Sequence, residues 1–190
     1  MTFDGNVKAG VDTRTGTLLL DPKNITIGSG SSDSISSAVF ATNESEDSTI
    51  TPGTITSALD AGTNVVLQAN NDITVSSAIT ANNGSGDGGN LTLQAGRSIL
   101  VNANITTDNG DLTLTANDTG AVAGQRDSGA AAITMNGSTI DTGTGTFTAT
   151  LSTNSTSGDI TLNTVTASAL VIANNGTTAG SDILDSGVLT

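Results

Sequence analysis

The side chains best suited to chemistry in this sequence are its carboxylates, because the chain contains no histidine, cysteine, tryptophan or tyrosine. Histidine and cysteine are the commonest general bases, nucleophiles and transition-metal ligands. Acid–base chemistry by carboxylates needs acids held together, and no predicted strand carries two of them two residues apart. Asp72, Asp111 and Asp159 each stand directly before an apolar strand, a position typical of a turn. Lys8 and Lys23 lie in polar surroundings that do not favour Ser–Lys chemistry. We therefore expect no catalytic residue and no enzyme activity.

A second candidate is the glycine-rich stretch NGSGDGGN, residues 83–90. Its composition is similar to calcium-binding turns and to phosphate-binding loops. Calcium turns of that kind stack in series, whereas this stretch occurs once, and no predicted helix follows it to offer its N-terminus to a phosphate. We interpret it as a flexible corner before a strand, and we expect neither a metal site nor a cofactor.

The elements that carry these residues repeat along the chain. The phrase VVLQANNDITV begins at Val65, LTLQAGRSILV begins at Leu91 and LTLTAND begins at Leu112, while residues 17–27 hold a looser copy. Apolar residues alternate with polar ones in each copy, so they share one face of a strand. Repetition at this period indicates a solenoid, in which each coil buries its apolar face only against its neighbours. Ile133 and Met135 are interpreted as the next copy of the same strand.

Each coil is predicted to hold three short strands. Leu67 and Ile73 are six residues apart, as are Leu93 and Ile99, so equivalent turns separate a first strand from a second. A third apolar point follows at Ile79 and again at residue 105. Three strands and three polar corners per coil predict an all-β fold, the parallel β-helix, with about six to eight coils. Asparagine and aspartate suit such corners because they tolerate left-handed backbone angles.

Two stretches, 28–50 and 117–130, break the repeat and are predicted to be loop excursions. A short helix is expected near residues 52–60, because Thr51 can cap it, a proline occupies its first position and Gly62 follows its end. Strands predicted after Ile140 are closely spaced, as if they lie on different faces of one coil. The whole chain, 1–190, is interpreted as a single β-helix segment of a longer chain or of a polymer.

Composition agrees with a thin aliphatic core, since hydrophobic residues make up 35% of the chain and aromatic residues only 2%. The net charge is −13, with 18 acidic and 5 basic residues, which argues against binding to nucleic acids and to anionic membranes. No apolar stretch is long enough to predict a membrane span. Without cysteine there is no disulfide, and the first residues do not form a signal peptide.

The phrases LTLQAGRSILV and VVLQANNDITV resemble the coils of filamentous-haemagglutinin-type exoproteins of bacteria. The segment ITPGTITSALDAGTNVVLQANNDITV is similar to the phrase that introduces repeats in many of them. The resemblance covers most of residues 15–175, and no N-terminal secretion domain of that family is recognisable. It implies export by two-partner secretion, a right-handed β-helix, and a fibre that is released or displayed on the bacterial surface.

The function expected from the sequence is therefore structural: a stalk segment of a secreted or cell-surface adhesin-like fibre, serving adhesion, biofilm formation or cell contact. Its partners would be neighbouring β-helix segments of the same or identical chains and an unknown receptor, contacted through the loops at 28–50 and 117–130. One alternative is a filament subunit that joins end to end by β-strand pairing. A minor alternative is an ice-binding surface made by an outward threonine row, namely Thr92, Thr113, Thr134 and Thr161.

Overall fold

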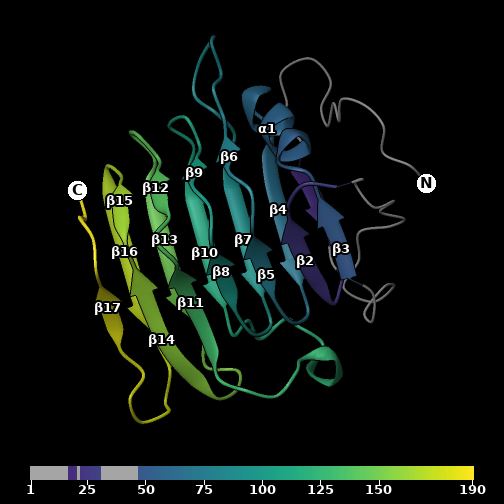
Figure 1. Cartoon of the computed structure of the whole chain (residues 1–190), viewed down its shortest axis with the longest axis vertical. Coiled ribbons are helices and arrows are strands. Elements are labelled where there is room, and N and C mark those ends of the chain that lie inside the picture. Colours follow the sequence, from purple (N-terminus) through teal and green to yellow (C-terminus); the bar gives the residue numbers. More distant parts are fainter. Residues whose placement is uncertain (1–16, 21, 31–46) are drawn as a thin grey trace.

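The structure is a computed structural model that describes residues 17–20, 22–30 and 47–190. It is a parallel β-helix, in which three parallel sheets run side by side along one axis (Figure 1). Sheet A has six strands: β1 (Thr17–Leu20), β4 (Asn64–Ala69), β7 (Leu91–Ala95), β10 (Leu112–Ala116), β13 (Thr146–Leu151) and β16 (Ala169–Asn174). Sheet B has seven strands: β3 (Asp47–Ile50), β2 (Asn24–Ile27), β5 (Ile73–Val75), β8 (Ile99–Val101), β11 (Ala131–Met135), β14 (Ser157–Leu162) and β17 (Ile183–Asp185). Sheet C has four strands: β6 (Ile79–Thr80), β9 (Ile105–Thr106), β12 (Thr139–Asp141) and β15 (Thr164–Thr166).

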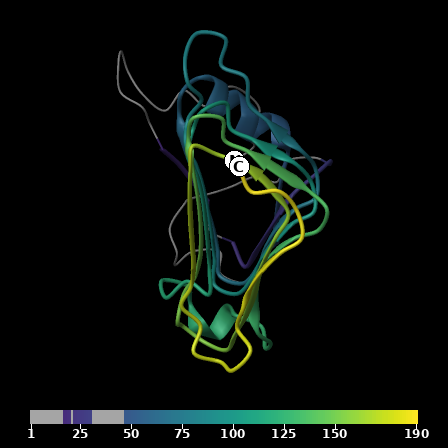
Figure 2. The same ribbon diagram turned by 90° about the vertical axis from the view of Figure 1, so that its left-hand side faces the viewer.

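The chain winds through the sheets in the order A, B, C, and each passage is one coil. Six coils begin at the six strands of sheet A, in agreement with the lower end of the predicted range. Figure 2 looks along the axis and shows the coils superposed around a narrow interior. Coils 2 to 5 contain one strand from each sheet, whereas coil 1 contributes β1 and β2. The sixth coil holds β16, β17 and a bridge between Leu189 and Val165. Right-handed winding, which parallel crossovers favour, stays a prediction.

The core consists of columns of aliphatic side chains, one from each coil. Leu67, Leu93 and Leu114 stack in sheet A with no exposed surface. The reason is the alternation of each strand, which turns every second side chain inward, while in-register pairing places equivalent residues about 4.8 Å apart. Sheets B and C repeat the arrangement with isoleucines, including Ile73 on Ile99 and Ile79 on Ile105. The predicted column of leucines is therefore confirmed.

One predicted equivalence is wrong. Ile133 and Met135 do not continue the first strand of the repeat; they lie in sheet B, where Ile133 pairs with Ile99. The next strand of sheet A after β10 is β13, in which Phe147 pairs with Leu112. The error arose because an excursion separates β10 from β11 within one coil, and because alternation with period two is the same in all three sheets.

The first excursion is shorter than predicted. Its residues 31–46 lie outside the described part of the chain, but Asp47–Ile50 form strand β3, which pairs with β2 along its whole length. Ile50 pairs with Ile27 and is buried. One apolar residue of β3 therefore adds a further inward side chain to the column that contains Ile27. The second excursion, 117–130, separates β10 from β11 and holds a short 3-10 helix, η1 (Ala123–Gln125). The closely spaced strands after residue 140 do alternate between sheets.

Helix α1 (Pro52–Asp60) forms where the sequence predicts it and covers an edge. Thr51 occupies the N-cap position with extended backbone angles, and its hydroxyl lies 3.1 Å from that of Thr54. The helix ends at Asp60, and Gly62, two residues later, has a φ of 70° in the left-handed region. Helix α1 packs against β4 and β6, and its Leu59 is buried in the core (Figure 1). It therefore covers the side of β6 that has no strand partner, as edge strands require.

Polar side chains at the corners join each coil to the next in one direction. The side-chain oxygen of Asn64 accepts the backbone N–H of Asn90, 2.9 Å away, and the oxygen of Asn90 accepts that of Asp111, also at 2.9 Å. Asp111 then accepts the N–H of Thr146 at 2.8 Å. Each oxygen binds the residue one coil closer to the C-terminus, so these corner ladders have a direction and satisfy backbone donors that would otherwise lack partners.

Glycines are required where the corner between sheets C and A is tightest. A Cβ on Gly110 would lie 2.9 Å from the carbonyl carbon of Gly89, in the coil before, and a Cβ on Gly145 would meet the backbone of Gly110 in the same way. Because Gly89, Gly110 and Gly145 stack directly, any side chain there would push two coils apart. Left-handed angles at this corner are taken by Asp108 and Asn109.

Candidate functional site

Of the aspartates considered for catalysis, Asp72 and Asp111 lie at corners, as predicted, whereas Asp159 lies within β14 rather than before it; the three are not brought together. Asp72 accepts the backbone N–H of Ser98 at 3.0 Å, and Asp159 accepts that of Asp182 at 2.9 Å. At a different corner of the coil, Asp111 accepts the backbone N–H of Thr146 at 2.8 Å. Each carboxylate therefore continues a corner ladder, and no two of the three face a common space in which an acid and a base could act together.

The glycine-rich stretch 83–90 forms a protruding corner between β6 and β7. Asn83 donates its side-chain amide to the carbonyl oxygen of Asp87 at 2.9 Å, and its backbone N–H binds the Asp108 carboxylate. Gly88 donates its N–H to the carbonyl oxygen of Asp108 at 2.7 Å. Within the described residues, no group of three or more histidine, cysteine, aspartate or glutamate side chains is placed to hold a metal ion.

The threonine row considered for ice binding is split between two sheets. Thr92 and Thr113 are neighbours in sheet A, and the next residue of that column is Thr148. Thr134 lies in sheet B, between Leu100 and Thr161. The expected row of Thr92, Thr113 and Thr134 is therefore corrected, for the same reason that Ile133 was misplaced. The same column of sheet A holds Leu19 and Val66 before Thr92, and it ends with Val171.

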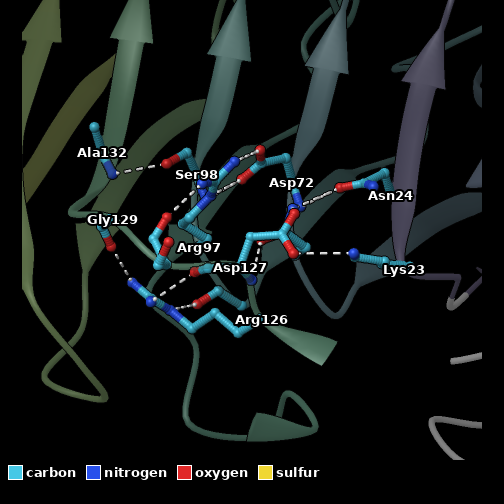
Figure 3. Close-up of polar contacts among 12 residues, drawn as sticks. Lys23, Asn24, Asp72, Arg97, Ser98, Arg126, Asp127, Gly129 and Ala132 are labelled. Atoms are coloured by element: carbon cyan, nitrogen blue, oxygen red, sulfur yellow. Dashed lines mark hydrogen bonds and ion pairs between the residues drawn. The ribbon is translucent and has the colours of Figure 1, made fainter. Parts of the chain in front are cut away.

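The strongest concentration of charge lies at the corner between sheets A and B. The sequence has five basic residues, of which Lys23, Arg97 and Arg126 lie in the described part of the chain, and all three meet at this corner (Figure 3). They come from three different coils. The second excursion, residues 117–130, brings these three side chains together. We call it the strap, because it runs back over the corners of coils 3, 2 and 1.

The strap begins beside coil 3. Asn117 adopts a left-handed φ of 56° and donates its N–H to the carbonyl oxygen of Arg97 at 3.0 Å. Its buried amide also binds the carbonyl oxygens of Ser152 and Ser155 in coil 5. Further along, the N–H of Val122 binds the side-chain oxygen of Asn70 in coil 2 at 2.8 Å. The strap therefore replaces water as the partner of polar groups at the coil corners.

The far end of the strap is held by Asp127. Its backbone N–H and one carboxylate oxygen both bind the side chain of Asn71 at 3.0 Å, and Asn71 is almost fully buried. The other carboxylate oxygen lies 3.0 Å from the ammonium of Lys23 in coil 1. Asn71 in turn donates to Asn24 at 2.9 Å. Asp127 thus reaches from coil 4 to the first coil through one ion pair and one shared asparagine.

Two arginines fix the middle of the strap. Arg97 forms a bidentate pair with Asp72, in which its Nε lies 2.9 Å from a carboxylate oxygen, and its Nη1 donates to the carbonyl oxygen of Ser128 at 3.0 Å. Arg126 donates only to backbone carbonyl oxygens, those of Gly96, Asp127, Gly129 and Thr156. Bidentate pairs of this kind are among the stronger polar contacts in proteins.

The pKa shifts at this corner follow from the same contacts. The hydrogen bond from Lys23 lowers the pKa of the Asp127 carboxyl. The hydrogen bond to Asp72 raises the pKa of Arg97, whereas burial and the neighbouring Arg97 charge lower the pKa of Arg126. Each guanidinium or ammonium has oxygen partners within the protein. The corner therefore suits the role of a clamp between coils better than that of an anion-binding or acid–base site.

Sequence reasoning placed the strap as a loop but missed this network. Arg97 and Ser98 were interpreted as an ordinary turn, and Asp127 as part of a solvent-exposed excursion. One signal was present: an acidic and a basic residue, Asp72 and Arg97, one position apart in two equivalent corners of a chain with very few basic residues. The outer turn of the strap, around η1, is partly to fully exposed, and residues 127–130 at its far end are exposed as well.

No protein-family model, curated protein or solved structure matches the chain. In the part of the chain that the structure describes, no helix has the length and apolarity needed to cross a lipid bilayer. Function must therefore be inferred from the residues and their geometry.

Proposed function

We propose that this chain is a structural stalk segment of a bacterial secreted or cell-surface adhesin-like fibre, located outside the cell, and that it is not an enzyme. The observation that carries the proposal is the continuous core: inward side chains stack in register from coil to coil, as Leu67, Leu93 and Leu114 do. A solenoid of this kind transmits its architecture to any coil stacked upon it. The resemblance of the repeated phrase to filamentous-haemagglutinin-type coils supports the same role.

The placement of charge also supports a structural role. The described cations serve contacts between coils, and the described aspartates at the corners accept backbone N–H groups, as Asp72 and Asp111 do. A protein with a net charge of −13 is repelled by other acidic surfaces, which favours a soluble, extended shaft. The partners in this proposal are neighbouring β-helix segments and an unidentified receptor bound elsewhere on the fibre.

The alternative of an end-to-end filament has weaker support. In sheet B, Asp185 pairs with the fully buried Leu162, so a charge occupies a core column in the last coil. In-register stacking of two copies would set Asp185 of one copy against Ile50 of the next, at the start of that column. Burying an unpaired carboxylate is costly. Helix α1 would also obstruct stacking onto sheet C. The ice-binding alternative loses support because its threonine row is split.

The proposal is tested by labelling the native assembly. A Fab fragment raised against the outer turn of the strap, residues 119–125, is added to intact cells and to the secreted fraction, which are then viewed by electron microscopy. We expect label along the shaft of extended fibres outside the cell. A variant with Ala123, Gly124 and Gln125 replaced serves as the control and should not be labelled. Label confined to compact particles or to the cytoplasm would contradict the proposal.

The purified chain separates the stalk from the filament alternative. For a stalk segment, negative-stain images should show short particles of uniform size at every concentration tested. Regular filaments that lengthen with concentration would instead favour end-to-end assembly, and their loss on replacing Ile50 with aspartate would locate the junction.

A further inference from the structure

Coils of a solenoid ordinarily stabilise only their nearest neighbours. Unfolding then begins at an end, because a terminal coil has a neighbour on one side only. The ladders of the present chain follow this rule: β2 pairs with β3 and β5, and β5 pairs with β8. Contacts between coils that are not adjacent are therefore a departure from the architecture, and the strap supplies them.

The strap joins coil 4 to coil 1, two coils beyond its neighbour. It leaves sheet A at Ala116 and returns to sheet B at Ala131, and between these points Asp127 binds Lys23 of coil 1. On the way it contacts coil 2 through Asn70 and Asn71. Figure 3 shows Asp127 between Lys23 and Arg97, beneath the strands of sheet B. Coils 1, 2, 3 and 4 are thereby tied by one segment, which also contacts coil 5 through Asn117 and Arg126.

Coil 1 is an end coil that such a tie can support. Within the described residues it has strands in sheets A and B but none in sheet C, where β6 of coil 2 is the first strand. Lys23 and Asn24 stand at the corner between β1 and β2, so the strap holds coil 1 where its two strands meet. The side chains of Lys23 and Asp127 are 27% and 50% exposed, so salt can weaken the pair.

We propose that the strap is a conformational lock that makes coils 1 to 4 open as a single unit, so that the first coil does not fray independently. Breaking the bond between Asp127 and coil 1 uncouples that coil and leaves the coils beyond the strap unchanged. The lock depends on ionic strength because its terminal contact is a partly exposed ion pair.

Native-state hydrogen exchange of the whole chain tests the lock. The reporter is the amide of Ile25 in β2, which binds the carbonyl oxygen of Asp72, and the reference is the amide of Ile160 in β14, which binds that of Asp182. In Asp127→Ala the Ile25 amide should exchange about tenfold faster, the size expected for loss of charge-assisted hydrogen bonds. The Ile160 amide should keep its rate. Lys23→Met should accelerate Ile25 in the same direction by a smaller factor.

The control variant is Asp87→Ala, which removes the same charge from the opposite corner of the coil and should leave both amides unchanged. Wild-type protein provides a second measurement that needs no mutation. Raising the salt concentration from about 0.1 M to about 1 M shortens the screening length from about 10 Å to about 3 Å. Hydrogen exchange of the Ile25 amide should then become faster, while that of the Ile160 amide should not change. If Asp127→Ala speeds exchange only within the strap itself and Ile25 keeps its wild-type rate, the strap does not couple the coils and the proposal is overturned.

Discussion

Replacing Gly110 with alanine tests the stacking of the coils at their tightest corner. The added Cβ would lie 2.9 Å from the carbonyl carbon of Gly89, whereas carbon atoms prefer about 3.5 to 4.0 Å. Relieving that contact must open coil 4 from coil 3 by about 0.6 Å or more. Two hydrogen bonds of 2.9 Å would then stretch to the limit of hydrogen-bond distance, from Leu91 to Asp111 and from Asp111 to Asn90.

The expected loss of stability combines three contributions. Overpacking costs about 1 to 3 kcal/mol, and weakening two hydrogen bonds costs about 1 kcal/mol each at most. The φ of Gly110 lies outside the left-handed region, so alanine is tolerated there and gains about 0.4 to 1 kcal/mol by restricting the unfolded chain. The free energy of unfolding of Gly110→Ala should therefore fall by up to about 5 kcal/mol, with about 2 kcal/mol at the middle of these ranges, measured as a lower urea midpoint with an unchanged slope.

The control is Gly84→Ala, where the new Cβ meets nothing within 4 Å. Only the effect on the unfolded chain remains there, so the urea midpoint should stay the same or rise slightly. Opposite signs for the two substitutions would support direct stacking of Gly89, Gly110 and Gly145. If both alanines raised the midpoint, the coils would be further apart at this corner than described and the reasoning would fail.

Three further predictions concern the core, the helix and the strap. Leu93→Asp should cost several kcal/mol because it buries an unpaired charge, whereas Thr92→Asp on the outer face should be mild; equal urea midpoints would show that the inward and outward positions are misassigned. Leu59→Ala should lower the free energy of unfolding by about 2 to 5 kcal/mol, because it leaves a cavity between α1 and β6, while Ser57→Ala on the exposed face serves as its control. The pKa of Asp127 is lowered in the folded protein, so its contribution to stability is present above its unfolded value of about 3.9 and is lost as the pH falls through the folded value. Urea midpoints of Asp127→Asn should therefore decline less steeply on acidification than those of the wild type, and parallel curves would contradict the assignment.

The repeat could be predicted from sequence wherever a coil is uninterrupted. Alternating residues and a constant six-residue step placed Leu67, Ile73 and Ile79 correctly in three successive strands, and the same holds one coil later. The helix was equally clear, because a proline at its start and Gly62 after its end leave little choice of boundaries. These features depend on residues close together in the chain, and their physical causes are local.

Features that depend on distant residues could not be predicted. Ile133 was assigned to the wrong sheet because an inward isoleucine has the same alternating pattern in sheets A and B. Strand β3 escaped notice because its sequence, DSTI, has one apolar residue and forms by pairing with β2. The strap network joins Lys23 to Asp127, 104 residues apart, and both are ordinary corner residues in sequence. Their meeting follows only once the coils are stacked.

The direction of the corner ladders bears on how such a chain can change over generations. Asn90 receives a bond from the coil after it and donates its N–H to the coil before it, so a duplicated coil of this kind would find both partners ready on either side. Gain or loss of one whole winding outside the coils that the strap joins therefore leaves the corner ladders intact, whereas deletion of a few residues breaks the register of all three sheets. The length of such a solenoid can therefore change in whole-coil steps, while the stacking register fixes its cross-section.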